Sequence, residues 1–469
     1  MDSLFRRRDM QASWGSRRSF LETWPAALGA LAIGAASVSP AAAAPAPRRK
    51  PYVFVTLDGP DDGGDFGPHT PGTKTCGIQE AIDYAHANFR DVYIFGGRGG
   101  LHQGRGAPDN VYTLDQSLRI PWSQDFRLDG GNYVLAYRKT EGAAVHIDSQ
   151  MNCRYKLGLI ASNSIDPTVW IRPETPGPDD FTVITASVFD FSGVCSGHPQ
   201  GTAILVDSSK GPIINCKIFA EEFNAVGTGV HLTDARGAGH SIANNQIQIL
   251  FGNQGHSRGH CVGLRLGDPG SRNILHNKVE MSLHAPRGAH FDEEKKKYVV
   301  RDDLVPQDAI GADVFAQSNF LSLTFYGKRP PGEDIVFEPE ARDNTVFAFN
   351  LPNGITNKAT IPNNRIIPNW PVGFGVSTPA VPPAGEFAVN AHPYTVQIII
   401  LDAGEVSQWT IAEPGPVNPT VVGKPGPAEP SRSQTISGGL MPGQMILLAP
   451  GERVRFTYGK APTWRWKAV

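Results

Sequence analysis

The sequence predicts an all-β protein whose middle is a solenoid of stacked coils, and three neighbouring segments carry that prediction. They are GTAILVDSSKGPIINCKI from Gly201, GTGVHLTDARGAGHSIANNQI from Gly227 and VGLRLGDPGSRNILHNKV from Val262. Each holds a short strand of alternating apolar residues, a turn with an aspartate, a second apolar strand and an asparagine. A repeat of roughly 20 to 50 residues with so few apolar side chains can bury them only by stacking on its neighbours.

The period of the repeat is that of a strand and not of a helix. Val230 and Leu232 alternate with polar residues, so one side of the strand faces inward and the other outward. Fainter copies of the pattern extend it in both directions, beginning at Gly142, Gly311 and Asp334. The repeat therefore covers most of the middle of the chain.

The chain resembles right-handed parallel β-helix proteins of the pectin-lyase-like superfamily. The resemblance rests on these repeats and on the opening segment TKTCGIQEAIDYAHANFRDVYIFGGRGG with the following VYTLDQSLRI. The resemblance spans residues 73–370. It implies a right-handed parallel β-helix whose first coil is closed by a short helix. Thr75 is the expected N-cap, and the apolar stripe of the helix consists of Ile78, Ala81, Ile82 and Ala85.

The N-terminal stretch SRRSFLETWPAALGALAIGAASVSPAAAA resembles a twin-arginine export signal, in which Arg17 and Arg18 precede an alanine-rich apolar run. A disordered basic tail is the alternative. We expect a signal peptide over residues 1–43, a linker over 44–72 and a periplasmic, cell-surface or extracellular protein. No later apolar run reaches the ~20 residues of a spanning helix, so we expect no membrane anchor after cleavage.

Past residue 370 the pattern changes to antiparallel-looking strands separated by proline and glycine, which predicts a β-sandwich-like module over 371–469. Its closing phrases LAPGERVRFTY and APTWRW resemble small C-terminal modules of trimeric β-helix fibres, which implies a homotrimer. Trp409, Trp464 and Trp466 are expected to pack in the module or between subunits; a sugar-stacking platform is the alternative.

Composition excludes several functions. With 43 Lys and Arg against 45 Asp and Glu, the chain has no overall field that would attract nucleic acid or an anionic membrane. Its five cysteines show no C-x-x-C spacing, so neither a zinc site nor a disulfide framework is indicated, and Cys216 is expected in the core. The histidine-rich phrase GHSRGH at 255–260 lacks accompanying carboxylates, so we expect neither a metal nor another cofactor.

One set of candidate residues occupies the outward position of the first strand in successive coils. If the coils stack ~4.8 Å apart, these residues stand in a row on an exposed sheet. A cation beside a carboxylate there suits sugar-acid binding and acid/base chemistry, although it is also ordinary surface composition. The row is His146, Leu205, His231, Arg265 and Phe315, with Asp313 two residues before Phe315.

A second set lies on three insertions that follow the second strand of the coil and are expected to wall a groove along one edge. They carry Glu221, Glu222, Asn224, His256, Arg258, His260, His284, Arg287, His290 and Asp292. The segment from Asp292 to Lys297 is expected to be a hairpin tip.

For a glycosidase, Glu221 or Glu222 is the expected acid and Asp313 its partner, at a separation of ~5 to 5.5 Å or ~6.5 to 9.5 Å according to mechanism. For a lyase, the base is His231 or His284 and the cation Arg265 or Arg287. The residues expected to bind substrate are Arg265, Arg287, His256, Arg258 and His260.

Two recurring sets are expected to be structural. Turn aspartates bind nearby backbone N–H groups, and inward asparagines stack to satisfy turn backbone. The sets are Asp148, Asp207, Asp234 and Asp268, and Asn215, Asn245 and Asn277.

The sequence thus predicts a secreted protein that acts on a polysaccharide or oligosaccharide by cleaving glycosidic bonds, as a hydrolase or a lyase. The substrate class comes from the resemblance. The N-T-D, D-D and G-H-G set of polygalacturonases and the calcium-binding aspartates of pectate lyases are missing, so those activities are not carried over. The alternatives are a non-catalytic glycan-binding protein, a structural fibre or envelope component, and an epimerase.

Overall fold

The computed structural model of the 469-residue chain describes residues 51–96, 110–131, 133–254, 260–285, 289–292, 297–300, 308–327, 332–361, 363–368, 376–413, 420–421, 424–425 and 432–469. In this part of the chain nearly all regular structure is β-strand, and the α-helix is α1 (Ile78–Ala87). A short 3-10 helix, η1 (Gly59–Asp62), precedes it.

Three parallel sheets run along the solenoid. Sheet A, the largest, follows the order β1 (Tyr52–Val55), β2 (Asp91–Phe95), β6 (Arg127–Gly131), β10 (Arg154–Ser162), β13 (Val188–Ser196), β16 (Lys217–Ala225), β19 (Gln246–Gln254), β22 (Lys278–His284), β26 (Phe320–Tyr326), β28 (Thr345–Phe349) and β30 (Arg365–Pro368). Two further strands join it, with β3 (Val111–Leu114) paired to β7 (Val134–Tyr137) and β7 to β10.

Sheet B follows the order β29 (Ile355–Asn357), β27 (Gly332–Phe337), β25 (Asp308–Val314), β20 (His260–Leu266), β17 (Thr228–Thr233), β14 (Thr202–Asp207), β11 (Val169–Ile171), β8 (Val145–Ile147) and β4 (Leu118–Ile120). Sheet C is built from two-residue strands in the order β21 (Ile274–Leu275), β18 (Ile242–Ala243), β15 (Ile213–Ile214), β12 (Ile184–Thr185), β9 (Gln150–Met151) and β5 (Ser123–Gln124).

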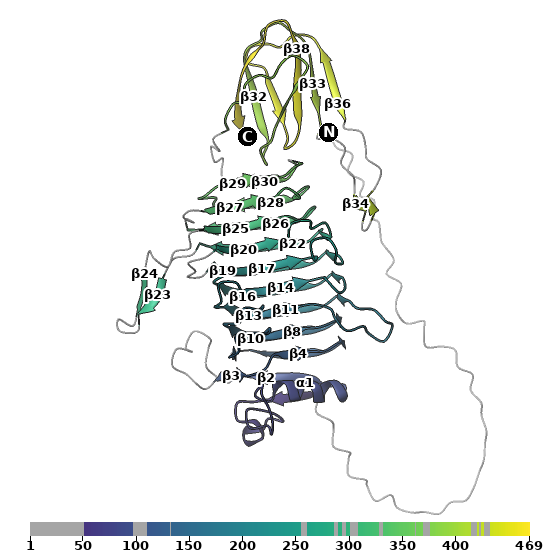
Figure 1. The fold of residues 1–469 in the computed structure, drawn as a ribbon, viewed down its shortest axis with the longest axis vertical. Helices are drawn as coiled ribbons and strands as arrows, with labels where there is room; N and C mark the ends of the chain where they lie inside the picture. The colour runs from purple at the N-terminus through teal and green to yellow at the C-terminus, as the bar shows by residue number, and fades with distance from the viewer. Residues whose placement is uncertain are drawn as a thin grey trace, which may run out of the picture. The chain divides into compact units, whose positions relative to one another are not determined.

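The coils from β4 to β22 pass through sheet B, sheet C and sheet A in turn, as in β14, β15 and β16, and each then enters the next coil on sheet B; the later coils pass from sheet B to sheet A without a sheet C strand. Figure 1 shows the coils stacked one above another, with α1 against the first of them. This is the right-handed parallel β-helix that the sequence predicted. Strand β1 lies inside the predicted linker and pairs with β2, so sheet A begins before residue 73.

The turn from sheet C into sheet A places one residue per coil in the left-handed region. Where a coil has a sheet C strand, this residue directly follows that strand. The φ angles of these residues lie between 52° and 59°. Asparagine and aspartate tolerate this conformation better than other side chains with a Cβ. The residues are Asp125, Asn152, Ala186, Asn215, Asn244, His276, Ser318 and Asp343.

The next residue points inward, and from the middle of the solenoid onward it is an asparagine. Five buried asparagines form a ladder in which each side-chain amide donates to the Oδ1 of the next, at distances of 2.8 to 3.4 Å. Each Oδ1 after the first also accepts the backbone N–H of the preceding member. The members are Asn245, Asn277, Asn319, Asn344 and Asn364.

The ladder corrects one sequence prediction. Asn215 is not a member, because it occupies the left-handed turn. Its neighbour Cys216 faces inward in that coil, and its backbone N–H donates to Asn245 Oδ1 at 2.9 Å. Cys216 is buried, as predicted, and behaves as a small core side chain.

Apart from the asparagine ladder, most side chains that fill the interior are apolar. Val230, Leu232, Leu264 and Leu266 are all fully buried, as their alternation predicted. The glycines that open the sheet B strands are required by close packing: a Cβ on Gly229 would lie 2.4 Å from the carbonyl oxygen of Gly263.

The capping helix buries the predicted stripe of Ile78, Ala81, Ile82 and Ala85. Its N-cap position is Gly77, in the left-handed conformation, and not Thr75. The Thr75 hydroxyl still accepts the backbone N–H of Gln79 at 3.1 Å, so it satisfies one of the free donors of the first turn.

The C-terminal module consists of two antiparallel sheets with their own apolar core. One contains β31 (Phe387–Val389), β38 (Arg453–Tyr458), β33 (Val406–Ala412) and β36 (Ser433–Ser437); the other contains β37 (Met445–Leu448), β32 (Val396–Asp402) and β39 (Thr463–Ala468). A separate pair is formed by β34 (Thr420–Val421) and β35 (Lys424–Pro425). Trp464 and Trp466 are only 6% and 3% exposed, so they pack inside the module.

All five cysteines lie in the described part of the chain and have free thiols. No helix among the described residues is long and apolar enough to cross a membrane.

We expect Asn277→Ala to lower the free energy of unfolding by about 3 kcal/mol, because it leaves a buried acceptor and several backbone groups of the ladder unpaired. Urea denaturation followed by circular dichroism measures this. Asn253→Ala, on the outward side of β19, is the matched control and should cost much less. Equal losses in the two variants would contradict a structural ladder.

We expect Ala186→Asn to raise the free energy of unfolding by about 1 kcal/mol, because Ala186 adopts a left-handed φ of 52° that alanine disfavours. Thermal melting against the wild type tests this. Thr185→Asn, one residue earlier and outside the left-handed region, should give no gain. Destabilisation by Ala186→Asn would show that the side chain at this turn is constrained by something other than φ.

Candidate functional site

Outward side chains of sheet B meet in register from one coil to the next. Cα pairing places them in one continuous row: Arg119, His146, Trp170, Leu205, His231, Arg265, Asp313, Val336 and Thr356. At about 4.8 Å per coil, the charged and aromatic members lie within side-chain reach of their neighbours.

The row differs from the predicted one in two places. Asp313 takes the position beside Arg265, because Ala312 and Val314 on either side of it point into the apolar core. Phe315 follows the strand, and its ring centroid lies 5.4 Å from the Arg265 guanidinium carbon. A coil with Trp170 also stands between His146 and Leu205.

Asp268 forms the centre of one charged cluster. Its Oδ1 lies 3.3 Å from His231 Nε2 and 3.3 Å from Arg265 Nη2, and its Oδ2 accepts the Thr233 hydroxyl at 2.6 Å. Burial alone would raise the pKa of this carboxyl. The contact with His231, the hydrogen bond from Thr233 and the charge of Arg265 outweigh burial and hold the pKa of Asp268 at about 2.

Asp313 has the opposite environment. It is only 5% exposed, and its Oδ1 is buried with no hydrogen-bond partner among the described residues. Burial, together with the negative charge of Glu338, raises the pKa of Asp313 to about 6, although Arg265 pulls in the other direction.

The two carboxyl groups therefore differ in protonation over several pH units, and Arg265 contacts one while standing in register with the other. Pairs of titratable groups whose pKa values are pushed apart by their surroundings are the usual basis of acid/base catalysis. This arrangement can donate a proton from Asp313 while Asp268 stays ionised.

A second cluster lies on the far side of Leu205 in the row. Arg172 pairs with Glu174, and its guanidinium carbon lies 3.8 Å from the centre of the Trp170 ring. The Trp170 indole N–H donates to Asp207 at 3.2 Å. Burial, with the charges of Arg119 and Arg172, lowers the pKa of His146. The Trp170 indole N–H and the end of the Arg172 guanidinium group are thus already engaged with neighbouring side chains, which indicates a supporting surface and not a reactive one.

Sequence reasoning missed Trp170, Arg172 and Glu174. Their coil lacks the glycine and asparagine of the repeat phrase, and a long segment separates β11 from β12. The sequence did contain a pattern that could have identified this strand. In the triplet VWI, Trp170 lies between two apolar residues that point inward, so the tryptophan takes the outward position.

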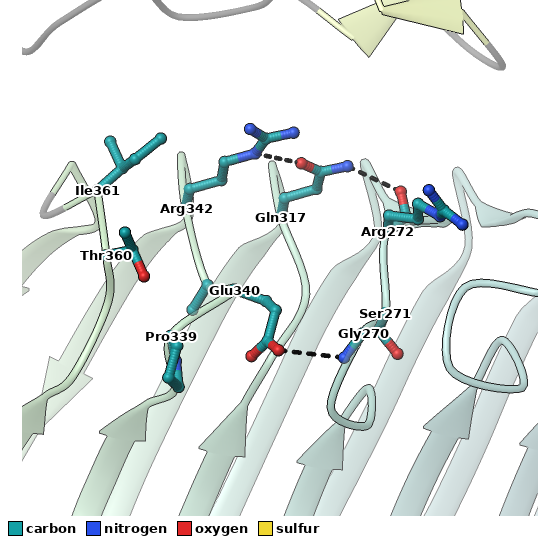
Figure 2. A pocket seen from close by; sticks show the side chains of 10 residues that line it. Gly270, Ser271, Arg272, Gln317, Pro339, Glu340, Arg342, Thr360 and Ile361 are labelled. Atoms are coloured by element: carbon teal, nitrogen blue, oxygen red, sulfur yellow. Dashed lines mark hydrogen bonds between the residues drawn. The ribbon is translucent and has the colours of Figure 1, made fainter.

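A recess of about 280 Å³ lies where the chain leaves sheet B just beyond Asp268 and Glu338. Figure 2 shows Arg342, Gln317 and Arg272 on three consecutive coils, linked in that order by hydrogen bonds. On its opposite wall the Glu340 carboxylate accepts the N–H of Gly270 at 3.1 Å. Both polar atoms of the Gln317 amide are therefore engaged within the wall of the recess.

Glu221 and Glu222, the predicted acids, lie on sheet A and not on sheet B. The segment that holds them is no insertion but the middle of β16, which is two residues longer than β22. Both face outward in succession because the inward–outward alternation shifts there; the buried neighbours are Ala220 and Phe223. The structure therefore does not bring them together with Asp313.

The other predicted residues are dispersed. His284 ends β22 on sheet A and stacks on Tyr326, and His260 begins β20 on sheet B. His256, Arg258 and Arg287 lie outside the described residues. β20 pairs directly with β25, and β22 with β26, so the long segment between β22 and β25 adds no coil. Within it, β23 (Ala289–Asp292) and β24 (Lys297–Val300) form the predicted hairpin.

The turn aspartates divide into two groups. Asp234 is fully buried and accepts backbone N–H groups of Gly237, Arg272 and Asn273, so it is structural as predicted. Asp268 instead binds side chains of the outward row, which the sequence pattern could not distinguish. In the part of the chain that the structure describes, no group of three or more His, Cys, Asp and Glu residues could hold a metal ion.

No protein-family description matches the chain, and no curated protein matches it. Among solved structures, it is similar to a mutant tailspike protein of E. coli bacteriophage HK620 in complex with a pentasaccharide, with 9% identity, 85% of this chain and 89% of that chain covered, and a TM-score of 0.20. A double mutant of the same tailspike, also with pentasaccharide, has the same identity and coverage and a TM-score of 0.17. The functional argument therefore depends on the residues of this chain.

We expect Asp313→Asn to stabilise the protein at pH 7.5 by about 2 to 3 kcal/mol. A carboxyl whose folded pKa is raised to about 6 contributes stability below its ordinary pKa of about 4, and this is lost as the pH rises through 6. Urea unfolding at pH 4 and pH 7.5 measures the difference, which should vanish at the lower pH.

Asp268→Asn is the matched variant and should act in the opposite sense at pH 7.5, since its lowered pKa reflects a favourable charge. Stabilisation by neither or both substitutions would contradict the environments assigned to the two carboxyls.

Proposed function

We propose that the protein binds a polysaccharide or oligosaccharide on sheet B and hydrolyses a glycosidic bond with Asp313 and Asp268. The observation that carries the proposal is the pair of carboxyl groups beside Arg265, whose pKa values are about 6 and about 2. Glycosidases work with one protonated and one ionised carboxyl flanking the scissile bond.

In this mechanism protonated Asp313 donates its proton to the glycosidic oxygen as the bond to the anomeric carbon breaks. Ionised Asp268 stabilises the positive charge that develops on the sugar ring, and it accepts a proton from the water whose oxygen bonds to the anomeric carbon. Arg265 and His231 hold the Asp268 carboxylate in place. Release of the proton from Asp268 and uptake by Asp313 restore the starting state.

Hydrolysis is favoured over elimination by the pairing of Arg265. A lyase needs a cation that is available to neutralise the carboxylate of a uronate. Arg265 already contacts Asp268 at 3.3 Å, and the ionised Asp268 beside it would repel a second carboxylate.

A non-catalytic glycan-binding protein is the second candidate. The observation that favours it is the burial of Asp313, which leaves 5% of the residue accessible. A proton donor must reach the leaving oxygen, and a carboxyl that stays covered would instead only shape the surface. Export by the twin-arginine route and assembly as a homotrimer stay predictions.

We expect Asp313→Asn and Asp268→Asn each to lower the rate of cleavage about 1,000-fold. Wild-type activity should be highest at about pH 4 to 5 and fall above pH 6 as Asp313 ionises. The protein, starting near Ala44, is incubated with a panel of neutral and acidic polysaccharides. New reducing ends and the ultraviolet absorbance of unsaturated uronates are both measured.

The sharper test is Glu338→Gln, which removes a charge that raises the pKa of Asp313 and should move the alkaline limb of the pH profile to lower pH. Absorbance together with reducing ends would indicate elimination and contradict the assignment. Retained glycan binding with no cleavage across the panel would establish the second candidate.

A further inference from the structure

An aromatic surface on sheet A stands apart from the carboxylate pair. Phe251, His284 and Tyr326 come from three consecutive strands, β19, β22 and β26, and form a continuous line of rings. The ring centroids of Phe251 and His284 are 6.0 Å apart, and those of His284 and Tyr326 are 4.6 Å apart with an interplanar angle of 16°. We call these three residues the aromatic strip.

The strip is exposed for a local reason. Between Ile249 and Gly252 the pairing of β19 with β22 shifts register, so two residues of β19 oppose one of β22. This bulge turns both Leu250 and Phe251 outward, and Phe251 is 54% exposed. Tyr326, at the end of β26, is 43% exposed. Large rings held outward at a bulge are typical of a binding surface.

Polar groups continue the strip along the same edge. Cα pairing places Cys195, Asn224, Asn253, His284 and Tyr326 in one row across successive coils. From Asn224 to Tyr326 this row covers three coil steps, or about 14 Å. In the adjacent row Glu222 stands in register with Phe251. Amide and carboxylate groups thus flank the rings at one end.

Hollows lie at both ends of the row. A cavity of about 370 Å³ adjoins Asn224 and is also lined by Ser162, Asn163, Cys195 and Ser196. A second, of about 450 Å³, adjoins Tyr326 and is also lined by Asn350, Leu351 and Pro352. The row therefore joins two recesses, which suits an elongated ligand better than a compact one.

The chemistry of the row identifies the kind of ligand. The apolar faces of sugar rings pack on aromatic side chains, while amides and carboxylates hydrogen-bond hydroxyl groups. The row contains neither lysine nor arginine, so nothing in it attracts an acidic polymer. A protein partner would require a larger apolar patch than rings interrupted by asparagine and glutamate.

We propose that the aromatic strip, with Asn224, Asn253 and Glu222, is a binding surface for an uncharged polysaccharide chain, separate from the carboxylate pair on sheet B. It lies on another sheet and uses none of the residues assigned to cleavage. The strip holds a glycan by stacking whether or not sheet B hydrolyses it.

Affinity gel electrophoresis tests the proposal with soluble xylan, laminarin, galactomannan and starch, and with polygalacturonate as the acidic probe. The protein is Asp313→Asn, so that the probe is not shortened. At least one neutral probe should retard it, and Phe251→Ala and Tyr326→Ala should each weaken binding about tenfold, as expected for the loss of one stacking ring. Tyr326→Phe should retain most of the affinity.

Phe320→Ala is the matched control, because Phe320 is a 39% exposed ring on the same strand as Tyr326 but at its opposite end, where it packs near Phe347. It should bind as the parent does. Light scattering of each variant reports the oligomeric state.

Four results would overturn the proposal: no retardation by any neutral probe, retardation by polygalacturonate alone, equal loss in Phe320→Ala, or a change of oligomeric state in the strip variants. The last would make the strip a subunit contact. Cleavage of short substrates by Phe251→Ala and Tyr326→Ala tests the two proposals separately. Both variants should keep the cleavage activity of sheet B, so a loss of glycan binding in them would concern the aromatic strip alone.

Discussion

The turn from sheet C into sheet A is the constraint on which the rest of the solenoid depends. In eight successive coils of the described chain one residue adopts a left-handed φ and the next points inward. The inward residue is an asparagine from Asn245 onward, and its side chain bonds both the next asparagine and the backbone of the neighbouring coil. Because every coil bends at the same place, strands before and after the bend stay in register over the whole stack.

Register is what converts a repeat into a functional surface. Residues that are 34 to 48 positions apart in sequence, such as His231, Arg265 and Asp313, become neighbours about 4.8 Å apart. At that spacing charges determine each other's protonation. Arg265 and His231 keep Asp268 ionised, while burial and Glu338 keep a proton on Asp313 at mildly acidic pH. The same stacking on sheet A lines up Phe251, His284 and Tyr326. No repeated sequence pattern marks these three positions.

The sequence predicted the elements whose cause is local. Alternating apolar residues identified the strands, and a helical stripe identified α1. His231 and Arg265 were assigned to one outward row because each lies between two inward leucines or valines. The prediction failed where a coil departed from the phrase. Trp170 was missed because its coil has no asparagine, and Phe315 was placed beside Arg265 because the register of β25 could not be read from its own residues. Glu221 and Glu222 looked like an insertion, yet they are consecutive outward residues of one strand.

By itself the sequence determined the fold class, the apolar interior and the capping helix. Strand alternation, helical apolar stripes and turn residues reflect conformational preferences and burial patterns that are set within a few neighbouring residues. Only the tertiary structure decided that Asp268 contacts Arg265 while Asp313 pairs with it in register, that Asp234 binds backbone N–H groups while Asp268 binds side chains of the outward row, and that an aromatic strip crosses sheet A. These depend on which coil stacks on which and on a bulge in one strand. Pairing between distant strands is set by the sum of packing along the entire stack, so no short segment encodes it.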